Sequence, residues 1–510
     1  MSRHSRSNTA IRVVLAICSM LIIMALVVGS CIFRPSWLKA DSAEVSSASV
    51  SHTVSPRQVS TYCPARMTIA DTDSYGDSEY QASNGNVTSS TRYSAFGSVF
   101  RSSVFNFGAQ DDSSALTVEK RDADSQQSLY IASGSVDGGS QLQNTRLLSA
   151  TDGTGSVSSV MSWATDGDLK GVSAVSCIQP ALEQTFLVSG TKTGTTQQLV
   201  VANSSSKAAS VTVKIWGADK SGALALSTGS TLAVGAGTES VINLAAAAPD
   251  QEALYVSVSS TDAPIAAVVR TIDMDGLTSK GSDYSAPNNV SGKTLALSGV
   301  SEGDSTTVYV YADTTTDVTV SWIGEKGTTQ ANQQTLEGGR VSVIDLSKAP
   351  EGVQALSISA DEPISAAAKI TNDGDDDQTD FALVNAVEPT TISAMAIPDQ
   401  ATAVVDVVNM ADDEKTATLT AYNADGEPID QRDITLESNA STTVDLSDIN
   451  DGDVAAVSLS DPDGAMVWNA RIAQQDVSEA KLAGIAILGA VSLKEAREVV
   501  FSNNDMTVVR

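Results

Sequence analysis

The clearest pattern in the chain is an alternation of apolar and polar residues that recurs about once every hundred residues. It opens with the segments LVVANSSSKAASVTVKIW at Leu199, VYVYADTTTDVTVSW at Val308 and VVDVVNMADDEKTATLTAY at Val404. In each segment two β-branched runs flank a polar turn, and alternate residues along each run are apolar. About seven or eight such runs per copy predict one antiparallel, immunoglobulin-like β-sandwich for each repeat.

The pattern divides the chain into eight segments and gives an all-β fold class, with a β-propeller as the alternative to tandem sandwiches. We expect a cytoplasmic tail (1–12), a transmembrane signal anchor (13–33), a Ser-rich tether (34–60), an N-terminal β domain with a disulfide (61–184), three β repeats (185–290, 291–388 and 389–480) and a partial fourth repeat (481–510).

The last segment raises the question of what a fragment of about 30 residues packs against. LAGIAILG at Leu482 resembles the strands that open the repeats, whereas the segment 61–184 lacks the opening hairpin of the later copies. A piece this small and apolar must dock on an existing sheet. It either caps the third repeat or completes the N-terminal domain, and we favour the second because it closes the array and covers an exposed strand edge.

The N-terminal segment has the length and composition of a membrane span. Residues 13–33 carry no charge, and 21 residues of helix extend about 31 Å, which matches the bilayer core. The basic residues before the span predict a cytoplasmic N-terminus and an extracytoplasmic bulk. Two alternatives are a lipoprotein attached through Cys31, and cleavage near Ala40 with release of the protein.

The charge is strongly negative, with 61 acidic against 31 basic residues. Every acidic residue follows Lys39, so the acidity belongs to the expected extracytoplasmic part. Such a field repels phosphate backbones, and nucleic-acid binding is therefore excluded.

The four cysteines agree with export. Cys18 and Cys31 lie inside the expected span, which leaves Cys63 and Cys177 as the exported pair. Two cysteines in an oxidising compartment predict one disulfide, and two buried free thiols are the alternative.

One stretch resembles a known family. It runs from Gly167 as GDLKGVSAVSCIQPALEQTFLVSGTKTGTTQQLVVANSSSKAASVTVKIWGADKSG and is joined by YCP at Tyr62. These residues resemble a family of exported proteins from high-GC Gram-positive bacteria that is known only as a domain of unknown function. The resemblance implies a single-span β-repeat envelope protein and supplies no catalytic residue. Its matching positions are Gly171, Cys177, Pro180 and Asn203, and it departs from the family pattern at Phe186, where Trp is usual, and at Ser204, where Pro is common.

Residues for catalysis are scarce. The two histidines, His4 and His52, fall in the expected tail and tether, so neither a Ser-His-Asp triad nor a histidine-rich zinc site is expected. Acidic residues are so frequent that no pair stands out as a glycosidase pair. We therefore predict no catalytic residue, no cofactor and no enzymatic activity.

Two acidic clusters are candidates for a loose Ca²⁺ site, and solvated turns are the alternative. Counting twelve positions from the first aspartate of each cluster reaches Ala82 and Val384 rather than the glutamate of a helix-loop-helix site. The candidate ligands are Asp71, Asp73 and Asp77 in the first cluster and Asp373, Asp375 and Asp377 in the second.

These features predict a non-enzymatic, membrane-anchored extracytoplasmic protein that serves as a scaffold or interaction module of the cell envelope. Its partner would be an envelope protein or a glycan. The alternative is a glycan-binding or carboxylate-dependent glycan-cleaving protein. A cleft that holds two carboxyl groups about 5 to 10 Å apart beside exposed aromatic rings would favour that alternative.

Overall fold

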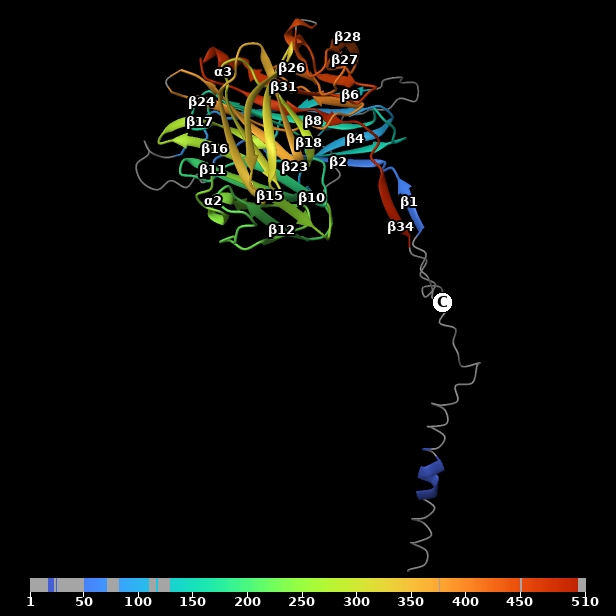
Figure 1. Ribbon diagram of the computed structural model, residues 1–510. Helices are drawn as coiled ribbons and strands as arrows, with labels where there is room; N and C mark the ends of the chain where they lie inside the picture. The colour runs from blue at the N-terminus through green and yellow to red at the C-terminus, as the bar shows by residue number, and fades with distance from the viewer. Residues whose placement is uncertain are drawn as a thin grey trace, which may run out of the picture. The chain divides into compact units, whose positions relative to one another are not determined.

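The computed structural model describes residues 17–22, 24, 50–70, 82–109, 116–117, 129–375, 377–449 and 452–502. The chain forms two compact units (Figure 1). The first comprises Met1–Val54 and Arg497–Arg510, and in it β1 (Val50–Val54) pairs antiparallel with β34 (Glu498–Ser502). The second, Ser55–Ala496, contains the other described strands.

The described strands of the second unit form four β-sandwich modules. Module 1 contains β2 (Gln58–Cys63), β3 (Thr88–Phe96), β4 (Val99–Asn106), β5 (Leu116–Thr117), β6 (Leu129–Gly134), β7 (Gln141–Leu147), β8 (Gly155–Ala164) and β9 (Gly171–Ser176). Module 2 contains β10 (Glu183–Ser189), β11 (Thr195–Asn203), β12 (Ala209–Trp216), β13 (Thr231–Val234), β14 (Thr238–Asn243), β15 (Ala253–Ser260), β16 (Ala266–Asp275) and β17 (Thr278–Ser285).

The remaining strands follow the same order. Module 3 contains β18 (Gly292–Ser298), β19 (Ser305–Ala312), β20 (Thr316–Gly324), β21 (Gly327–Leu336), β22 (Arg340–Lys348), β23 (Val353–Asp373) and β24 (Thr379–Asn385). Module 4 contains β25 (Ile392–Ala396), β26 (Ala401–Asn409), β27 (Lys415–Tyr422), β28 (Pro428–Leu436), β29 (Ser441–Asp445), β30 (Ala456–Ser460), β31 (Met466–Gln474), β32 (Ala486–Gly489) and β33 (Val491–Ser492). Short helical turns occur at α2 (Leu244–Ala247), η3 (Leu446–Asp448) and α3 (Gln475–Glu479).

All four modules share one antiparallel topology. In module 2, one sheet has the order β10-β15-β12-β13 and the other β14-β11-β16-β17, and modules 1 and 4 repeat these orders, with β33 added beside β25 in module 4. In module 3 the long β23 replaces two strands, because its first part pairs with β18 and β20 and its second part with β19 and β24. The all-β prediction is confirmed.

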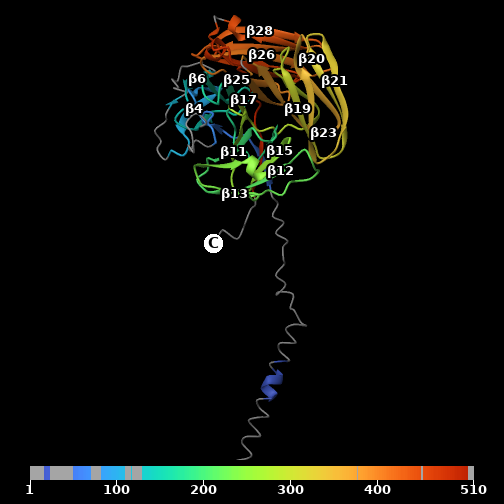
Figure 2. The same cartoon turned by 90° about the vertical axis from the view of Figure 1, so that its left-hand side faces the viewer.

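One strand of each module lies at the centre of the unit. It is the eighth strand of modules 1, 2 and 4 and the last strand of module 3, and we call β9, β17, β24 and β32 the inner strands. β9 contacts β17 and β32, and β24 contacts the same two strands. Figure 2 shows the modules as successive sectors around this centre, from blue through green and yellow to orange. The second unit is therefore a closed ring.

Apolar side chains cross every junction of the ring. They join module 1 to module 2 through Val160 and Val268, module 2 to module 3 through Leu187 and Tyr309, module 3 to module 4 through Ala296 and Val467, and module 4 to module 1 through Ala396 and Phe96. Because the last junction is packed like the others, the modules surround the axis without an open seam.

The ring closes by a different route from the one we expected. The strand β32, which contains the AILG of LAGIAILG, pairs with β31, and β33 pairs with β25, so these residues complete module 4. The N-terminal domain has all eight of its own strands and needs no completion. The segment 481–510 is therefore not the start of a fourth repeat, and its last strand, β34, pairs with β1.

Two other predictions concern the N-terminal residues, and the structure corrects one of them and does not describe most of the other. The tether prediction for 34–60 is wrong at its C-terminal end, because β1 and the start of β2 lie within it and Val59 packs against the core of module 1. The expected tail 1–12 and most of the expected span 13–33 fall outside the described residues. Among the residues that are described, no helix is long and apolar enough to cross a membrane.

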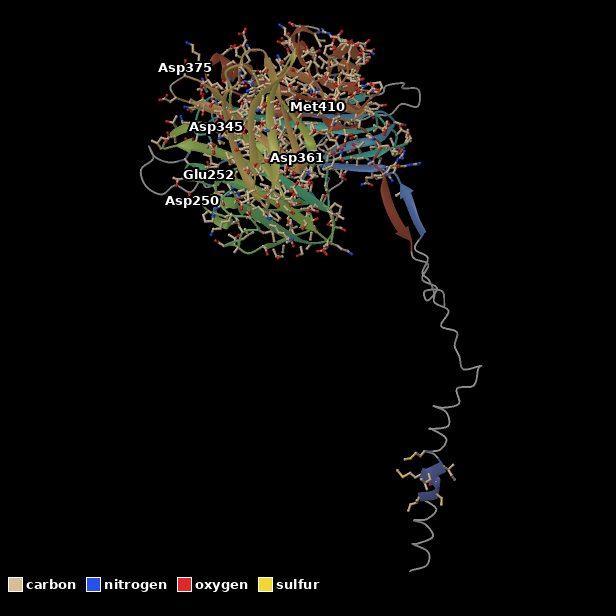
Figure 3. All side chains as sticks on the ribbon, viewed as in Figure 1. Asp250, Glu252, Asp345, Asp361, Asp375 and Met410 are labelled. Carbon is tan, nitrogen blue, oxygen red and sulfur yellow. A yellow bond between two sulfur atoms is a disulfide. The ribbon has the colours of Figure 1, made fainter. Side chains whose placement is uncertain are left out.

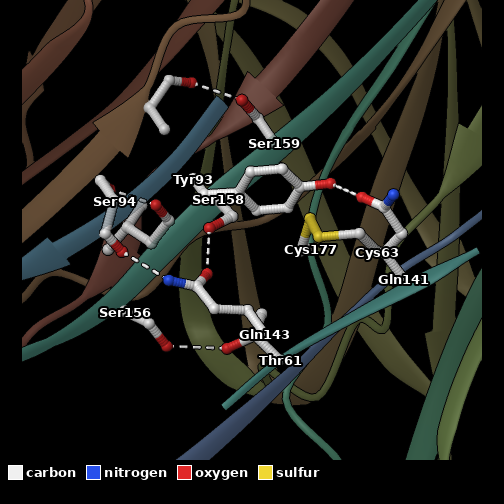
Figure 4. Close-up of a disulfide and its surroundings, with 12 residues drawn as sticks. Thr61, Cys63, Tyr93, Ser94, Gln141, Gln143, Ser156, Ser158, Ser159 and Cys177 are labelled. Atoms are coloured by element: carbon white, nitrogen blue, oxygen red, sulfur yellow. Dashed lines mark hydrogen bonds between the residues drawn. A yellow bond between two sulfur atoms is a disulfide. The ribbon is translucent and has the colours of Figure 1, made fainter. Parts of the chain in front are cut away.

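Module 1 has a disulfide and a polar interior (Figure 4). Cys63 and Cys177 are bonded, with Cα atoms 4.6 Å apart, which confirms the predicted pair. Between the two sheets, Gln143 donates to the carbonyl of Ser94 at 3.2 Å, and the Thr61 and Ser156 hydroxyls lie 2.8 Å apart. Hydrogen bonds as well as apolar contacts therefore join the two sheets of module 1.

Replacing both Cys63 and Cys177 by Ser should lower the free energy of unfolding by about 4 kcal/mol. The bond joins residues 114 positions apart, and opening so long a loop restores much entropy to the unfolded chain. Urea unfolding of the oxidised protein and of the double variant measures the difference. The free cysteine variant Cys18→Ser is the control, and equal midpoints for all three proteins would contradict the prediction.

Candidate functional site

At the centre of the ring, the unpaired edges of the inner strands need hydrogen-bond partners. Each inner strand pairs within its own sheet on one side only, with β8, β16, β23 or β31, so its other edge faces the axis. Backbone N–H groups on that edge are buried away from water and need acceptors. The acceptors turn out to be two aspartates on the inner strands themselves.

Asp380, at the start of β24, connects three modules. Its Oδ2 accepts from the backbone N–H of Val172 in β9 at 2.8 Å and from that of Ile485, just before β32, at 3.0 Å. Its Oδ1 accepts from the N–H of Phe381 at 3.0 Å. The side chain is fully buried, and one carboxyl group thus ties module 3 to modules 1 and 4.

Asp283 in β17 plays the same role for module 2. Its Oδ1 accepts from the N–H of Ala174 in β9 at 3.2 Å, and its Oδ2 accepts from the N–H of Leu383 in β24 at 2.8 Å. Burial raises the pKa of both Asp283 and Asp380 well above the usual range of a carboxyl group, and the backbone N–H groups oppose that shift.

Two glycines leave room for the Asp380 side chain. A Cβ atom at Gly171 would lie 2.4 Å from Asp380 Oδ2, and one at Gly281 would lie 2.6 Å from Asp380 Oδ1. Both glycines have positive φ angles, 128° and 107° respectively. Gly171 is one of the positions that carry the family resemblance, and the structure gives it this packing role.

A cavity of about 440 Å³ lies at the C-terminal ends of the inner strands. Its wall is built from those strand ends and from the four segments that follow them, including Ile178, Val290, Val387 and Val491. Its floor is formed at the level of Ala174, Tyr284, Leu383 and Ile487, next to the aspartates described above.

The lining of the cavity is mostly apolar, with a few fixed polar groups. Asn385 donates to the carbonyl of Ala286 at 2.8 Å, and the indole N–H of Trp468 donates to Ser393 Oγ at 2.7 Å. Glu388 is the one acidic or basic residue among the described lining residues. Histidine, lysine and aspartate are not among the described lining residues, which include several hydroxyl groups.

Asn469 in β31 is the exception among these polar groups. Its Nδ2 donates to the carbonyl of Ser298 in module 3 at 3.1 Å. Its Oδ1 is buried and has no hydrogen-bond partner among the residues that the structure describes. Asn469 is a lining residue of the cavity, but this oxygen has almost no accessible surface and is shielded from the cavity.

The same junction between modules 3 and 4 holds buried charge. Arg471 binds Asp304 through Nη1 at 2.5 Å and Nη2 at 3.1 Å. Asp406, opposite Asn469 in the β26–β31 ladder, is also buried. Burial raises the pKa of Asp406 to about 8, with Arg471 opposing the shift and Asp304 adding to it.

The structure places some of the residues predicted from the sequence at the cavity and others at the surface, and it does not describe the rest. Cys177 lines the cavity, and Cys63 anchors it from β2. Asp71, Asp73 and Asp77 lie outside the described residues. Asp373 pairs with Lys348 at 3.3 Å, and Asp375 and Asp377 are exposed. In the described ranges no group of three or more such side chains is placed to hold a metal ion.

Acidic side chains of several turns and strand ends lie at the surface, as the alternative of solvated turns expects. Figure 3 shows Asp250, Glu252, Asp345, Asp361 and Asp375 at the surface, and all of them are exposed. The sequence reasoning missed Asp283, Asp380 and Asn469. The available signal was an aspartate in an otherwise apolar strand, as in TDFALVN, which is costly unless a partner satisfies it.

Comparison with known proteins gives one match. A family model described as a family of unknown function (DUF5719) matches residues 131–447, from β6 of module 1 into module 4. No curated protein gives a significant match.

Gly171→Ala should destabilise the ring more than Gly139→Ala. Both glycines have a φ of 128°, but a Cβ at Gly139 would meet nothing within 4 Å. The φ angles are thus matched, and the difference reports on crowding against Asp380, which we expect to cost about 1 to 3 kcal/mol. Thermal unfolding measures it, and equal losses in the two variants would contradict the packing role of Gly171.

Asp406→Asn should remove part of the pH dependence of stability. The folded state retains the Asp406 proton up to about pH 8, whereas the unfolded state releases it near pH 4. The free energy of unfolding of the wild type therefore falls as the pH rises between these values, and the asparagine variant lacks this contribution. Relative to the wild type, the variant should gain stability from pH 5 to pH 8 in urea unfolding, whereas the exposed control Asp219→Asn should not.

Proposed function

The chain belongs to the DUF5719 family of unknown function, and from the cavity at the centre of its ring we propose a non-enzymatic binding protein of the cell envelope. It would act as an interaction module, held at the membrane by residues 13–33 with its bulk outside the cytoplasm. The disulfide supports an oxidising compartment. Attachment as a lipoprotein through Cys31 is the alternative, and the high-GC Gram-positive origin belongs to the same proposal.

The central cavity carries this proposal. Its volume of about 440 Å³ falls within the range of roughly 300 to 1,000 Å³ that is typical of small-molecule sites. The wall combines apolar side chains with a few fixed hydrogen-bonding groups, as such sites do. Because four packed modules build it, the cavity is formed before any ligand arrives.

The chemistry of the cavity argues against turnover. The serine hydroxyls of the lining have no histidine, lysine or aspartate beside them in that lining, and Glu388 is its single carboxylate. Hydrolysis of a glycosidic bond needs two carboxyl groups that face each other across the bond. Binding without reaction is the function that fits.

Glycan binding is the second candidate, and a different cleft favours it. About 430 Å³ in volume, this cleft lies between modules 1 and 4 and is lined by Asp399, Asp476, Trp163 and several hydroxyl and amide groups. Asp399 is engaged by the buried Arg92, and Trp163 is only 7% exposed. Without a free carboxylate pair or an open aromatic face, the cleft suits binding of a polyhydroxylated ligand better than cleavage.

Filling the cavity should abolish ligand binding. The lining residue Val290 is replaced by Trp, and the control is Val343→Trp on the exposed face of β22. Full-length proteins are purified from detergent-solubilised envelopes and compared by native mass spectrometry. We expect a small molecule bound to the wild type and the control and absent from Val290→Trp.

Two other outcomes would redirect the proposal. The same bound mass in all three proteins, lost only in Asp476→Ala, would move the function to the cleft between modules 1 and 4. No bound small molecule in any of them would contradict the proposed function.

A further inference from the structure

We propose that module 1 docks on a membrane surface that carries anionic lipids, through exposed arginine and apolar side chains at one end of a sheet. These residues are Arg57, Phe100, Arg101, Arg146 and Leu148, and we call them the arginine patch. None of the five is among the described lining residues of the central cavity. The inference therefore concerns a second surface, and it takes from the proposed function the attachment of the chain to a membrane.

The arginine patch lies where three neighbouring strands, β2, β7 and β4, begin or end together. Arg101 in β4 stands directly opposite Arg146 in β7, and Arg146 is also opposite Gln58, the first residue of β2. Arg57 precedes Gln58, and its carbonyl accepts from the N–H of Leu147 at 2.8 Å. Because neighbouring strands are about 5 Å apart, the backbones of the three arginines lie within about 10 Å of one another.

The three arginines form no ion pair with a carboxylate among the residues that the structure describes. All three are exposed, and Arg101 Nε donates to Ser103 Oγ at 3.1 Å, a contact that brings no negative charge. Like charges directly opposite each other in a ladder are destabilising, so the pair Arg101 and Arg146 favours an anion from outside the chain.

Other arginines of the described chain differ in this respect. Carboxylates pair with Arg66, Arg92, Arg340, Arg432 and Arg471. In a chain with 61 acidic and 31 basic residues, carboxylates are plentiful, and three neighbouring arginines without one are the exception.

Two exposed apolar side chains complete the arginine patch. Phe100 is 48% exposed and Leu148 is 38% exposed. The β4–β7 register shifts between Val99 and Arg101, so Phe100 is the extra residue of a bulge, and bulges change the direction of a side chain. Leu148 directly follows Leu147, the partner of Val99 in this ladder. Arginine beside exposed apolar groups suits a lipid interface, where guanidinium groups reach phosphates and apolar groups enter the headgroup layer.

The position of the arginine patch in the chain favours a membrane over other anions. Arg57 follows the proposed membrane span, 13–33, by about 24 residues, which reach at most about 80 Å when fully extended. The patch is therefore within reach of the bilayer to which the chain would be attached. Attachment also makes the docking intramolecular, which raises the effective concentration of the lipid surface.

The acidity of the rest of the chain determines which face turns toward the lipid. An anionic membrane repels a chain with twice as many acidic as basic residues, and this repulsion is screened beyond about 10 Å. Arginines in contact with headgroups are screened much less. The arginine patch therefore faces the membrane, and the acidic surfaces face away from it.

The test compares the full-length protein in nanodiscs of phosphatidylcholine and in nanodiscs of equal parts phosphatidylcholine and phosphatidylglycerol. Phenylglyoxal modifies accessible guanidinium groups, and peptide mass spectrometry gives the rate at each arginine. We expect Arg57, Arg101 and Arg146 to react at least about fivefold more slowly in the anionic nanodiscs, the change expected for one arginine at such a surface. Arg432, exposed in module 4, should react equally in both.

A double variant checks that the arginines act together. Arg101→Gln combined with Arg146→Gln should release Arg57, so that its rate in anionic nanodiscs returns to the rate in phosphatidylcholine. The matched control Arg432→Gln should leave the slow reaction of Arg57 unchanged.

The outcomes separate this inference from the proposed function. Equal rates at the three arginines in the two kinds of nanodisc overturn the docking, and this comparison needs no variant. Equal slowing by soluble glycerol phosphate in phosphatidylcholine nanodiscs also overturns it, because the ligand is then a free phosphate. A protein that does not insert into nanodiscs contradicts the membrane attachment. Cosedimentation with vesicles of the same two compositions then tests the patch by itself, and equal binding to both overturns the inference.

Discussion

The ring depends on how the open edges of its inner strands are satisfied. Four strand edges converge where water is excluded, and each unpaired N–H there would cost more than an ordinary hydrogen bond contributes. Asp283 and Asp380 accept these groups across module boundaries, so the polar contacts that satisfy the edges also hold the modules together. The same contacts also require glycine at positions 171 and 281, because the missing Cβ atoms leave the space that the Asp380 carboxyl occupies.

The cavity is a consequence of the same arrangement. Four copies of one topology surround the axis, but their sequences differ, and only two of the inner strands supply an aspartate. Beyond the level of these aspartates, the linkers leave the axis toward the next module and the packing opens. The lining therefore combines apolar side chains with polar ones from more than one module, such as Gln184, Asn289 and Asn385.

The sequence predicted most of the strands, the repeat length and the disulfide, because alternation and cysteine counting report on local structure and compartment. It missed the opening hairpin of module 1, where strands such as β3 (TSSTRYSAF) bury serine and threonine and so hide the apolar period. It also misread LAGIAILG, since a short apolar run has the same composition whether it opens or ends a module. The role of the central aspartates could not be predicted, because their partners lie on other modules; the local signal, an aspartate in an otherwise apolar strand such as TDFALVN, shows that a partner is needed but not which one.

The disulfide of module 1 also sets how the ring responds to force. It joins the end of the first strand, β2, to the segment just after the last, β9. A pull on the chain before Cys63, as a membrane attachment would exert, passes through the sulfur atoms to Cys177 and on toward module 2. The 113 residues between the two cysteines lie outside this load path. While the bond is intact, such a pull cannot extend those 113 residues, so a covalent bond rather than the polar core of module 1 limits how far the chain can be stretched there.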